Sequence, residues 1–237
     1  RAWTQDVVLK RSTMTEPPKL ALAIGGQRIP MVQEKDLAVR APLNGSERVD
    51  LENVPLVFVG YGAHAPERNW SDFKDMDVAG KVIVALVNDP DFETGEGDFG
   101  GEAMTYYGRW TYKYEEAARR GAVGILVIHE TEPASYPWGV IANGNHTSLD
   151  IVRDDPAAAH SALQGWMHVD IARRLFEAAG TTYEDAKVMA QQRDFQPMEL
   201  EATIDATLVT RKEEISAKNV VGLLPGSSRP DEHVVLT

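Results

Sequence analysis

Cysteine is absent from the 237 residues of this chain. Its absence excludes disulfide bonds, thiol nucleophiles and zinc sites with cysteine ligands. A chain without cysteine fits an exported bacterial protein. We therefore expect an extracytoplasmic location, which could be periplasmic, secreted or envelope-anchored.

Basic residues are scarce beside acidic ones: 24 Lys and Arg face 36 Asp and Glu, for a net charge of −12. A surface of this sign repels nucleic-acid phosphates and anionic lipids. Long apolar runs are missing too, since none approaches the roughly 18 residues that cross a bilayer. We expect no nucleic-acid partner and no membrane segment in this chain.

The common catalytic patterns are also missing. The chain has no Gly-x-Ser-x-Gly elbow, no phosphate-binding P-loop and no Gly-x-Gly-x-x-Gly after a strand. None of its six histidines stands at a close ligand spacing from another. We therefore assign no catalytic residue and no metal ligand within this chain.

Residues 110–130 carry the clearest pattern that is present. Trp110, Tyr114 and Ala117 recur at helical spacing, while Lys113 and Glu116 fall on the opposite, polar face. A glycine at position 121 ends the helix. The uniformly apolar residues 122–128 then predict a strand buried on both faces, which is typical of a parallel or mixed sheet covered by helices. The predicted fold class is α/β.

Other segments extend this interpretation along the chain. Strands are predicted near residues 7–9, over 54–59 and 81–87, and over 201–211, 219–224 and 232–236. A hairpin with a Gly-Gly turn is predicted over residues 20–32. Helices are predicted over 170–179 and from a capping box at Thr181 to Glu184 through about residue 192. Residues 131–164 are predicted to be irregular.

Residues 88–109 form an acidic, glycine-rich stretch without the calcium pattern of an EF-hand. It is predicted to be a solvated, mobile loop, or alternatively a lid over a site elsewhere. Tyr106, Tyr107, Arg109 and Trp110 follow the acidic residues. They either begin the helix and pack on the core or form a substrate-facing patch in which Arg109 pairs with a carboxylate.

Three blocks in order resemble a protease-associated domain. The first is residues 54–62, ending in Gly60-Tyr61-Gly62. The second, residues 77–87, begins Asp-Val-Ala-Gly-Lys-Val, and the third, residues 116–128, runs from an Ala-rich helix through Gly-Ala into a strand. The resemblance covers roughly residues 46–165. It implies a swivelling β/β/α fold with a mixed sheet or open barrel and flanking helices.

The end of the chain resembles the entry to the catalytic domain of co-catalytic di-zinc aminopeptidases, a family that includes the glutamate carboxypeptidase relatives. The similar residues are 216–227 and 230–237. In that family the matching strand runs into a His-x-Asp motif that begins the zinc site. This resemblance implies that the two zinc ions and the catalytic glutamate belong to residues beyond Thr237, so no cofactor is expected here. The uncapped apolar end at residues 234–236 likewise predicts a piece of a longer protein.

Together these features predict three parts: an extended flank of the peptidase domain (1–45), a protease-associated domain with a helical end (46–200), and the first strands of the catalytic domain (201–237). The expected role is non-catalytic control of substrate access in a zinc aminopeptidase, with the peptide substrate and the rest of the catalytic domain as partners. One alternative is a stand-alone protein- or peptide-binding module. Another is a hydrolase whose site uses scattered carboxylates such as Asp98 and Glu102.

Overall fold

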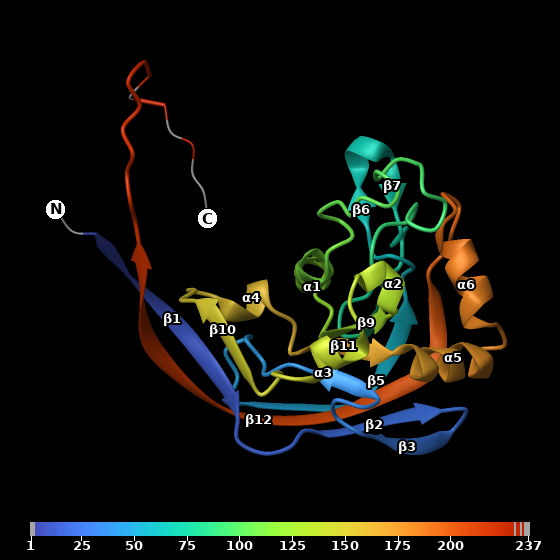
Figure 1. The fold of residues 1–237 in the computed structure, drawn as a ribbon. Helices are drawn as coiled ribbons and strands as arrows, with labels where there is room; N and C mark the ends of the chain where they lie inside the picture. Colours follow the sequence, from blue (N-terminus) through green and yellow to red (C-terminus); the bar gives the residue numbers. More distant parts are fainter. Residues whose placement is uncertain (1–2, 230, 233, 235–237) are drawn as a thin grey trace.

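The computed structural model describes residues 3–229, 231, 232 and 234. They form a large mixed sheet with helices on both sides, so the α/β class is confirmed (Figure 1). The main strand order is β10-β1-β12-β5-β8-β9-β11-β4, and the β2–β3 hairpin joins through β12.

Four strands run parallel at the centre of the sheet. They are β5 (Arg48–Phe58), β8 (Val82–Leu86), β9 (Gly124–His129) and β11 (Leu163–His168). Every residue of β9 is buried. Leu126 and Ile128 face one core cluster, and Ile125 and Val127 face another. The prediction of a strand buried on both faces is therefore confirmed.

Different helices cover the two faces. The long helices α5 (Val169–Ala178) and α6 (Tyr183–Ala190) pack into the first core cluster. The second cluster receives α1 (Trp110–Arg119) with the short helices α2 (Thr131–Ala134) and α3 (Trp138–Ala142). All three predicted helices are present. The cap of α6 is Thr182 rather than Thr181, because the Thr182 side chain accepts from the Asp185 amide.

The predicted face of α1 is partly wrong. Lys113 and Glu116 were placed on the exposed side, yet they are 1% and 5% exposed. Glu116 is paired with its own i+3 and i+4 neighbours, whereas Lys113 has distant partners that the helical pattern does not show. Glu116 forms ion pairs with Arg119 and Arg120 at 2.8 and 2.6 Å. Lys113 reaches loop carbonyls, as described below.

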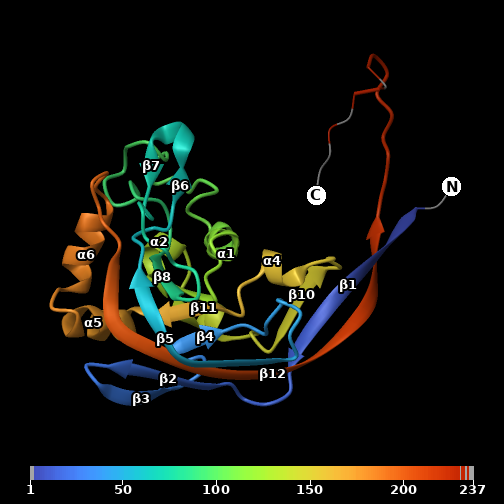
Figure 2. The ribbon, with the colours of Figure 1, turned by 180° about the vertical axis from the view of Figure 1, so that it is seen from behind.

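Strand β12 (Met198–Val220) is one strand of 23 residues where two were expected. Its first part pairs with β5 and with β2 (Lys19–Ile24), which forms the predicted hairpin with β3 (Gln27–Met31). Its last part pairs antiparallel with β1 (Thr4–Met14). We call β1 and residues 210–220 the stalk, and residues 15–209 the body. The outer end of the stalk projects from the body in both ribbon views, while residues 9–13 of β1 pair with residues 147–151 of the body (Figure 2).

Several small elements lie where an irregular stretch was expected. Residues 131–164 contain α2, α3, β10 (Thr147–Ile151) and α4 (Pro156–Ala159), as well as the first residues of β11. Strand β10 pairs with β1, and β4 (Leu37–Val39) pairs antiparallel with β11. The expectation of irregular structure was therefore wrong. It failed because these elements are short and interrupted by polar residues or glycine.

The predicted strands at the end of the chain have different outcomes. Residues 221–224 lie outside any strand, so this part of the prediction was wrong. For the strand expected over 232–236, residues 233, 235 and 236 lie outside the described residues. Residues 232 and 234 are described and belong to no strand.

The three-part division of the chain stays a prediction. Strands β2, β3 and β4, from the first 45 residues, lie in the same sheet as the segment 46–200. In the described part of the chain, no helix is long and apolar enough to cross a membrane.

Candidate functional site

The loops that follow the parallel strands meet at one edge of the sheet, where ligands commonly bind in α/β folds. Lys113 of α1 joins two of these loops, the one after β5 and the two ends of the one between β8 and α1. Its buried ammonium donates hydrogen bonds to the carbonyls of Tyr61 (2.5 Å), Asn88 (3.0 Å) and Tyr107 (3.2 Å). These carbonyls follow β5, follow β8 and precede α1. Lys113 therefore fixes the edge from inside.

Two buried carboxyl groups lie near this ammonium. Asp72 accepts hydrogen bonds from the Ala63 amide (2.9 Å) and from Trp70 Nε1 (2.8 Å). Burial raises the pKa of Asp72 to about 7 and lowers the pKa of Lys113 to about 8. Burial also raises the pKa of Asp89. Their charges and hydrogen bonds hold loops together, which is a structural role.

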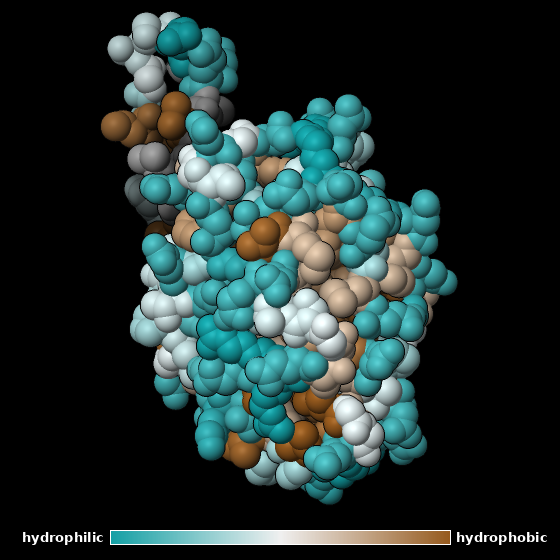
Figure 3. Space-filling view, turned by 90° about the vertical axis from the view of Figure 1, so that its right-hand side faces the viewer, coloured by the Kyte–Doolittle hydropathy of each residue, from teal (hydrophilic) through white to brown (hydrophobic). Residues whose placement is uncertain are grey.

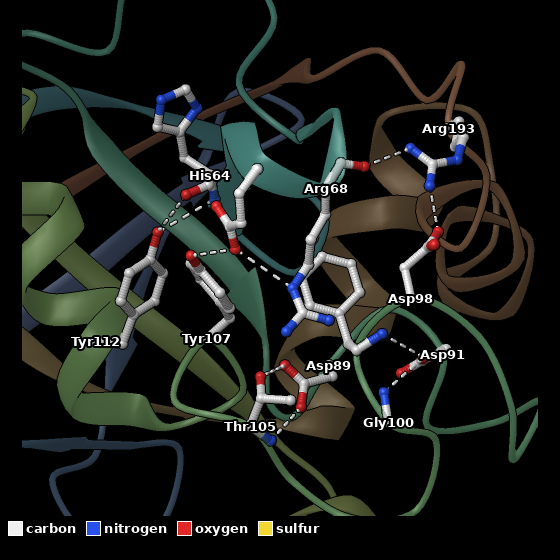
Figure 4. Close-up of polar contacts among 12 residues, drawn as sticks. His64, Arg68, Asp89, Asp91, Asp98, Gly100, Thr105, Tyr107, Tyr112 and Arg193 are labelled. Carbon is white, nitrogen blue, oxygen red and sulfur yellow. Dashed lines mark hydrogen bonds and ion pairs between the residues drawn. The ribbon is translucent and has the colours of Figure 1, made fainter.

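Two carboxylates hold the acidic loop 88–109 together through hydrogen bonds to other residues of the same loop. Asp89 accepts from the Thr105 amide (2.6 Å) and hydroxyl (2.8 Å). Asp91 Oδ2 accepts from the amides of Phe99 (2.7 Å) and Gly100 (3.1 Å). Figure 4 shows both carboxylates turned toward these groups. The expectation of a solvated loop was wrong for Asp89, Asp91 and Phe99, which are 0%, 7% and 1% exposed. The lid role stays a prediction.

A cavity of about 590 Å³ lies between this loop and residues 191–194. Arg193 bridges its two sides. It donates to the carbonyls of Arg68 (3.0 Å) and Asn69 (2.9 Å), pairs with Asp98, and covers the Trp70 ring at 5.3 Å. Figure 4 shows Arg193 and Asp98 facing each other. The cation in this cavity thus already has a carboxylate partner.

The four residues predicted to face substrate lie in two settings. Tyr106 and Tyr107 both pack edge-on against Tyr112, with ring centroids 5.6 and 5.0 Å away. The Tyr106 hydroxyl donates to Glu115 (2.8 Å) and the Tyr107 hydroxyl donates to Glu67 (2.9 Å). This arrangement satisfies both hydroxyls within the protein. The substrate-facing role of the two tyrosines stays a prediction.

Arg109 and Trp110 lie at the start of α1. Arg109 is exposed, and no ion pair of its guanidinium is found within the described part of the chain. Trp110 is 36% exposed and packs against Tyr114, with ring centroids 5.2 Å apart. Trp110 also lines a second pocket, away from the acidic loop. The substrate-facing role of these two residues likewise stays a prediction.

This second pocket, which we call the aromatic pocket, has a volume of about 530 Å³. Four aromatic side chains line it: Trp110, Tyr114, Tyr136 and Trp166. Arg40 enters from the end of β4, with its guanidinium 5.9 Å from the centre of the Trp110 ring. Sequence reasoning missed every member except Trp110. The aromatic and cationic residues come from four distant segments, so no local motif joins them.

No family model matches the chain, and no curated protein matches it. Among solved structures the chain is similar to the aminopeptidase from Aneurinibacillus sp. strain AM-1, with a TM-score of 0.37 and 14% sequence identity. The match covers 91% of this chain and 36% of that protein, so the chain spans about a third of its length. A likeness this distant establishes no family, and the proposal below rests on the chain's own sequence and geometry.

The described histidines and carboxylates form local contacts instead of a metal cluster. No group of three or more His, Asp or Glu side chains positioned to hold a metal is found within residues 3–229, 231, 232 and 234. His129 contacts the Tyr136 carbonyl (3.0 Å) and His160 contacts Asp150 (2.7 Å). These residues do not fit a zinc site.

The two carboxylates of the hydrolase alternative do not form a recognisable pair. Asp98 is bound to Arg193. The Glu102 side chain is exposed, and neither a hydrogen bond nor an ion pair of it is found in the described part of the chain. The geometry does not favour hydrolysis by these two groups.

Proposed function

We propose that this chain is a non-catalytic, protease-associated part of a longer zinc aminopeptidase, where it limits access of peptides to the active site. The resemblance blocks support this proposal, because they are neighbours in space. The block ending in Gly-Tyr-Gly forms β5, the Lys81 block forms β8, and the Ala-rich block forms α1 and β9. These strands lie side by side in the order β5-β8-β9.

Gly60, Tyr61 and Asp77 of these blocks have identifiable roles in packing or in turn formation. Gly60 has a φ of +58°, and a Cβ there would lie 3.0 Å from the Phe195 ring. Tyr61 is buried between the glycines. Asp77 accepts a hydrogen bond from the Ala79 amide (2.9 Å) and so shapes the turn before β8. The blocks build a scaffold and supply no reacting group, which fits a non-catalytic role.

The stalk is the single observation that carries the proposal. Strands β1 and β12 pair antiparallel from Thr4 opposite Val220 to Met14 opposite Thr210. The chain therefore enters and leaves the body through adjacent strands. Insertion of one domain into another requires this geometry, because the host chain must continue from nearly the point at which it was interrupted.

The remaining features of the proposal concern the longer protein. Its catalytic domain would hold the two zinc ions, which would activate a water molecule for attack on the peptide bond. Peptide substrates and the rest of that domain would be the partners of this chain. Tyr106, Tyr107, Arg109 and Trp110 are the proposed substrate-facing residues. The proposed location is extracytoplasmic in a bacterium.

Removal of the body from the longer protein tests the access role. Thr13 and Arg211 are cross-strand partners, so an Asn-Gly turn can join them in place of residues 14–210. The shortened enzyme should still hydrolyse a leucine p-nitroanilide. Its kcat/KM for long peptides should rise relative to its kcat/KM for the anilide. An unchanged ratio of kcat/KM between long peptide and anilide, with the small substrate still cleaved, would contradict the role. A matched enzyme with Asp91→Ala alone controls for disturbance of the loop.

The aromatic pocket favours a second candidate, a stand-alone peptide-binding module. Such a module would bind peptide without any attached enzyme. The two candidate functions predict different coding sequences after Thr237. The module requires the reading frame to end near Thr237, while the insert requires a catalytic domain to follow.

A further inference from the structure

The aromatic pocket opens between α1, α3 and β10. Figures 1 and 2 show α1 and β10 on the side of the body from which the stalk rises. The pocket volume of about 530 Å³ falls within the range of roughly 300–1,000 Å³ that is typical of ligand pockets. Its site is therefore concave and large enough for a small ligand.

A cation, the guanidinium of Arg40, lies in this pocket. Arg40 is half-buried, and its Nε donates to the Ser148 hydroxyl at 3.3 Å. No ion pair of its guanidinium is found among the described residues. Asp150 is the nearby acidic group, but it is bound by Arg153 (2.6 Å) and His160 (2.7 Å).

Burial lowers the pKa of Arg40, against the opposing effects of Tyr114 and Asp150. An arginine remains charged at neutral pH even so. A partly desolvated guanidinium whose other N–H groups meet no acceptor among the described residues strongly favours an anion with oxygen acceptors. The charge of the pocket therefore favours an oxyanion such as a carboxylate.

The aromatic and asparagine side chains of the pocket indicate which other groups a ligand would carry. Trp110 and the half-buried Tyr136 offer ring surface to an aromatic group, and Tyr114 and Trp166, each 5% exposed, add a small part of the lining. The side-chain amides of Asn143 and Asn145 donate to the carbonyls of Gly139 (2.8 Å) and Ile141 (2.6 Å). Their amide oxygens accept no hydrogen bond from the described residues. They can therefore accept from the N–H of a ligand.

We infer that the aromatic pocket binds the C-terminal residue of a peptide when that residue is aromatic, with its carboxylate on Arg40 and its ring against Trp110 and Tyr136. This inference does not depend on the proposed peptidase function. It concerns the chain alone and holds for an insert or for a stand-alone module.

The test uses N-acetyl-phenylalanine as the probe and its uncharged amide as the matched ligand. Binding to the full chain is measured by tryptophan fluorescence and by calorimetry. The acid should bind saturably, and the amide should bind at least about tenfold more weakly, because it loses the charge-assisted hydrogen bonds. Equal binding of the two ligands, or no binding of either, would overturn the inference.

Variants locate the site. Arg40→Gln should weaken binding of the acid to the level of the amide. Arg11→Gln, on the stalk, is the control and should bind the acid like the natural chain, because Arg11 pairs with Glu213 outside the pocket. Circular dichroism checks that each variant is folded, and the comparison of acid with amide on the natural chain needs no variant. Unchanged binding by Arg40→Gln, or binding of the neutral sugar maltose in place of the acid, would overturn the inference.

Discussion

Lys113 is an unusual residue of the body, because its ammonium is buried. Three backbone carbonyls take the place of water as its hydrogen-bond acceptors. Replacing it by methionine keeps the length but leaves those carbonyls without a donor. We expect Lys113→Met to lower the free energy of unfolding by about 3 kcal/mol, measured by urea denaturation. Lys10→Met is the control. Lys10 is 43% exposed in a surface ion pair, so the loss there should stay below about 1 kcal/mol. Equal losses would contradict the account.

Asp72 should make stability depend on pH. Its folded pKa of about 7 lies above the ordinary value of 3.8, so the folded state binds a proton that the unfolded state releases between these values. The contribution is complete below about pH 4 and is lost as pH rises toward 7. The unfolding free energy of the natural chain should therefore fall relative to Asp72→Asn over this range. Parallel curves for the two proteins would show that Asp72 does not titrate there.

These residues also show where prediction from sequence stops. Helical spacing correctly placed Tyr114 and Ala117 in the core, because apolar side chains are buried by their own chemistry. It wrongly predicted that Lys113 is exposed, because the carbonyls that accept hydrogen bonds from its ammonium lie 6 to 52 positions away in the sequence. Arg40 was missed in the aromatic pocket for the same reason.

At the scale of elements, the contact of β4 with β11 depends on a glycine. A Cβ at Gly165 would lie 2.8 Å from the Ala38 carbonyl oxygen and 2.9 Å from Val39 Cα. Because both neighbours are backbone atoms, Gly165→Ala should separate the strands and cost about 1–3 kcal/mol in a urea titration. At Gly139 of α3 a Cβ meets nothing within 4 Å, so Gly139→Ala should change stability by less than about 0.5 kcal/mol. A Gly165→Ala protein as stable as the control would refute this contact.

The acidic loop should depend on Asp91 and not on its exposed carboxylates. Removing the Asp91 side chain leaves the amides of Phe99 and Gly100 without an acceptor. Asp91→Ala should speed hydrogen exchange at these two amides by roughly tenfold or more. Glu96→Ala, at an exposed position, should leave both rates unchanged. Equal exchange in the two variants would restore the expectation of a mobile, solvated loop.

Strands were predicted well where their residues are apolar throughout. They were predicted poorly where a strand contains polar or charged residues that a neighbouring strand accommodates. Strands β8 and β9 followed from their apolar runs. Strand β11 was missed because Gln164 and Gly165 interrupt its pattern. The middle of β12 was missed because its charges are matched across the ladder. Glu213 pairs with Arg11 at 2.7 Å and Glu214 with Lys10 at 3.1 Å. The sequence of one strand does not show such a partner.

At the scale of the whole molecule, the stalk connects the body to the segment beyond residue 220. Large hydrophobic residues are exposed along that segment: Val221 (59%), Leu223 (70%) and Leu224 (94%). Figure 3 shows hydrophobic residues on this projecting part, and it shows mixed hydrophilic and hydrophobic areas on the face of the body in that view. An exposed apolar segment of this kind fits burial against the catalytic domain that the proposal requires.

The central proposal is that this chain is part of a zinc peptidase whose metal site lies beyond Thr237. The most direct test is to sequence the encoding gene past that codon. The account predicts that a short His-x-Asp motif follows at once, with acidic residues and another histidine further on. A stop codon there, or a continuing frame without these residues, would contradict the claim. The chain would then have to be studied as a binding module.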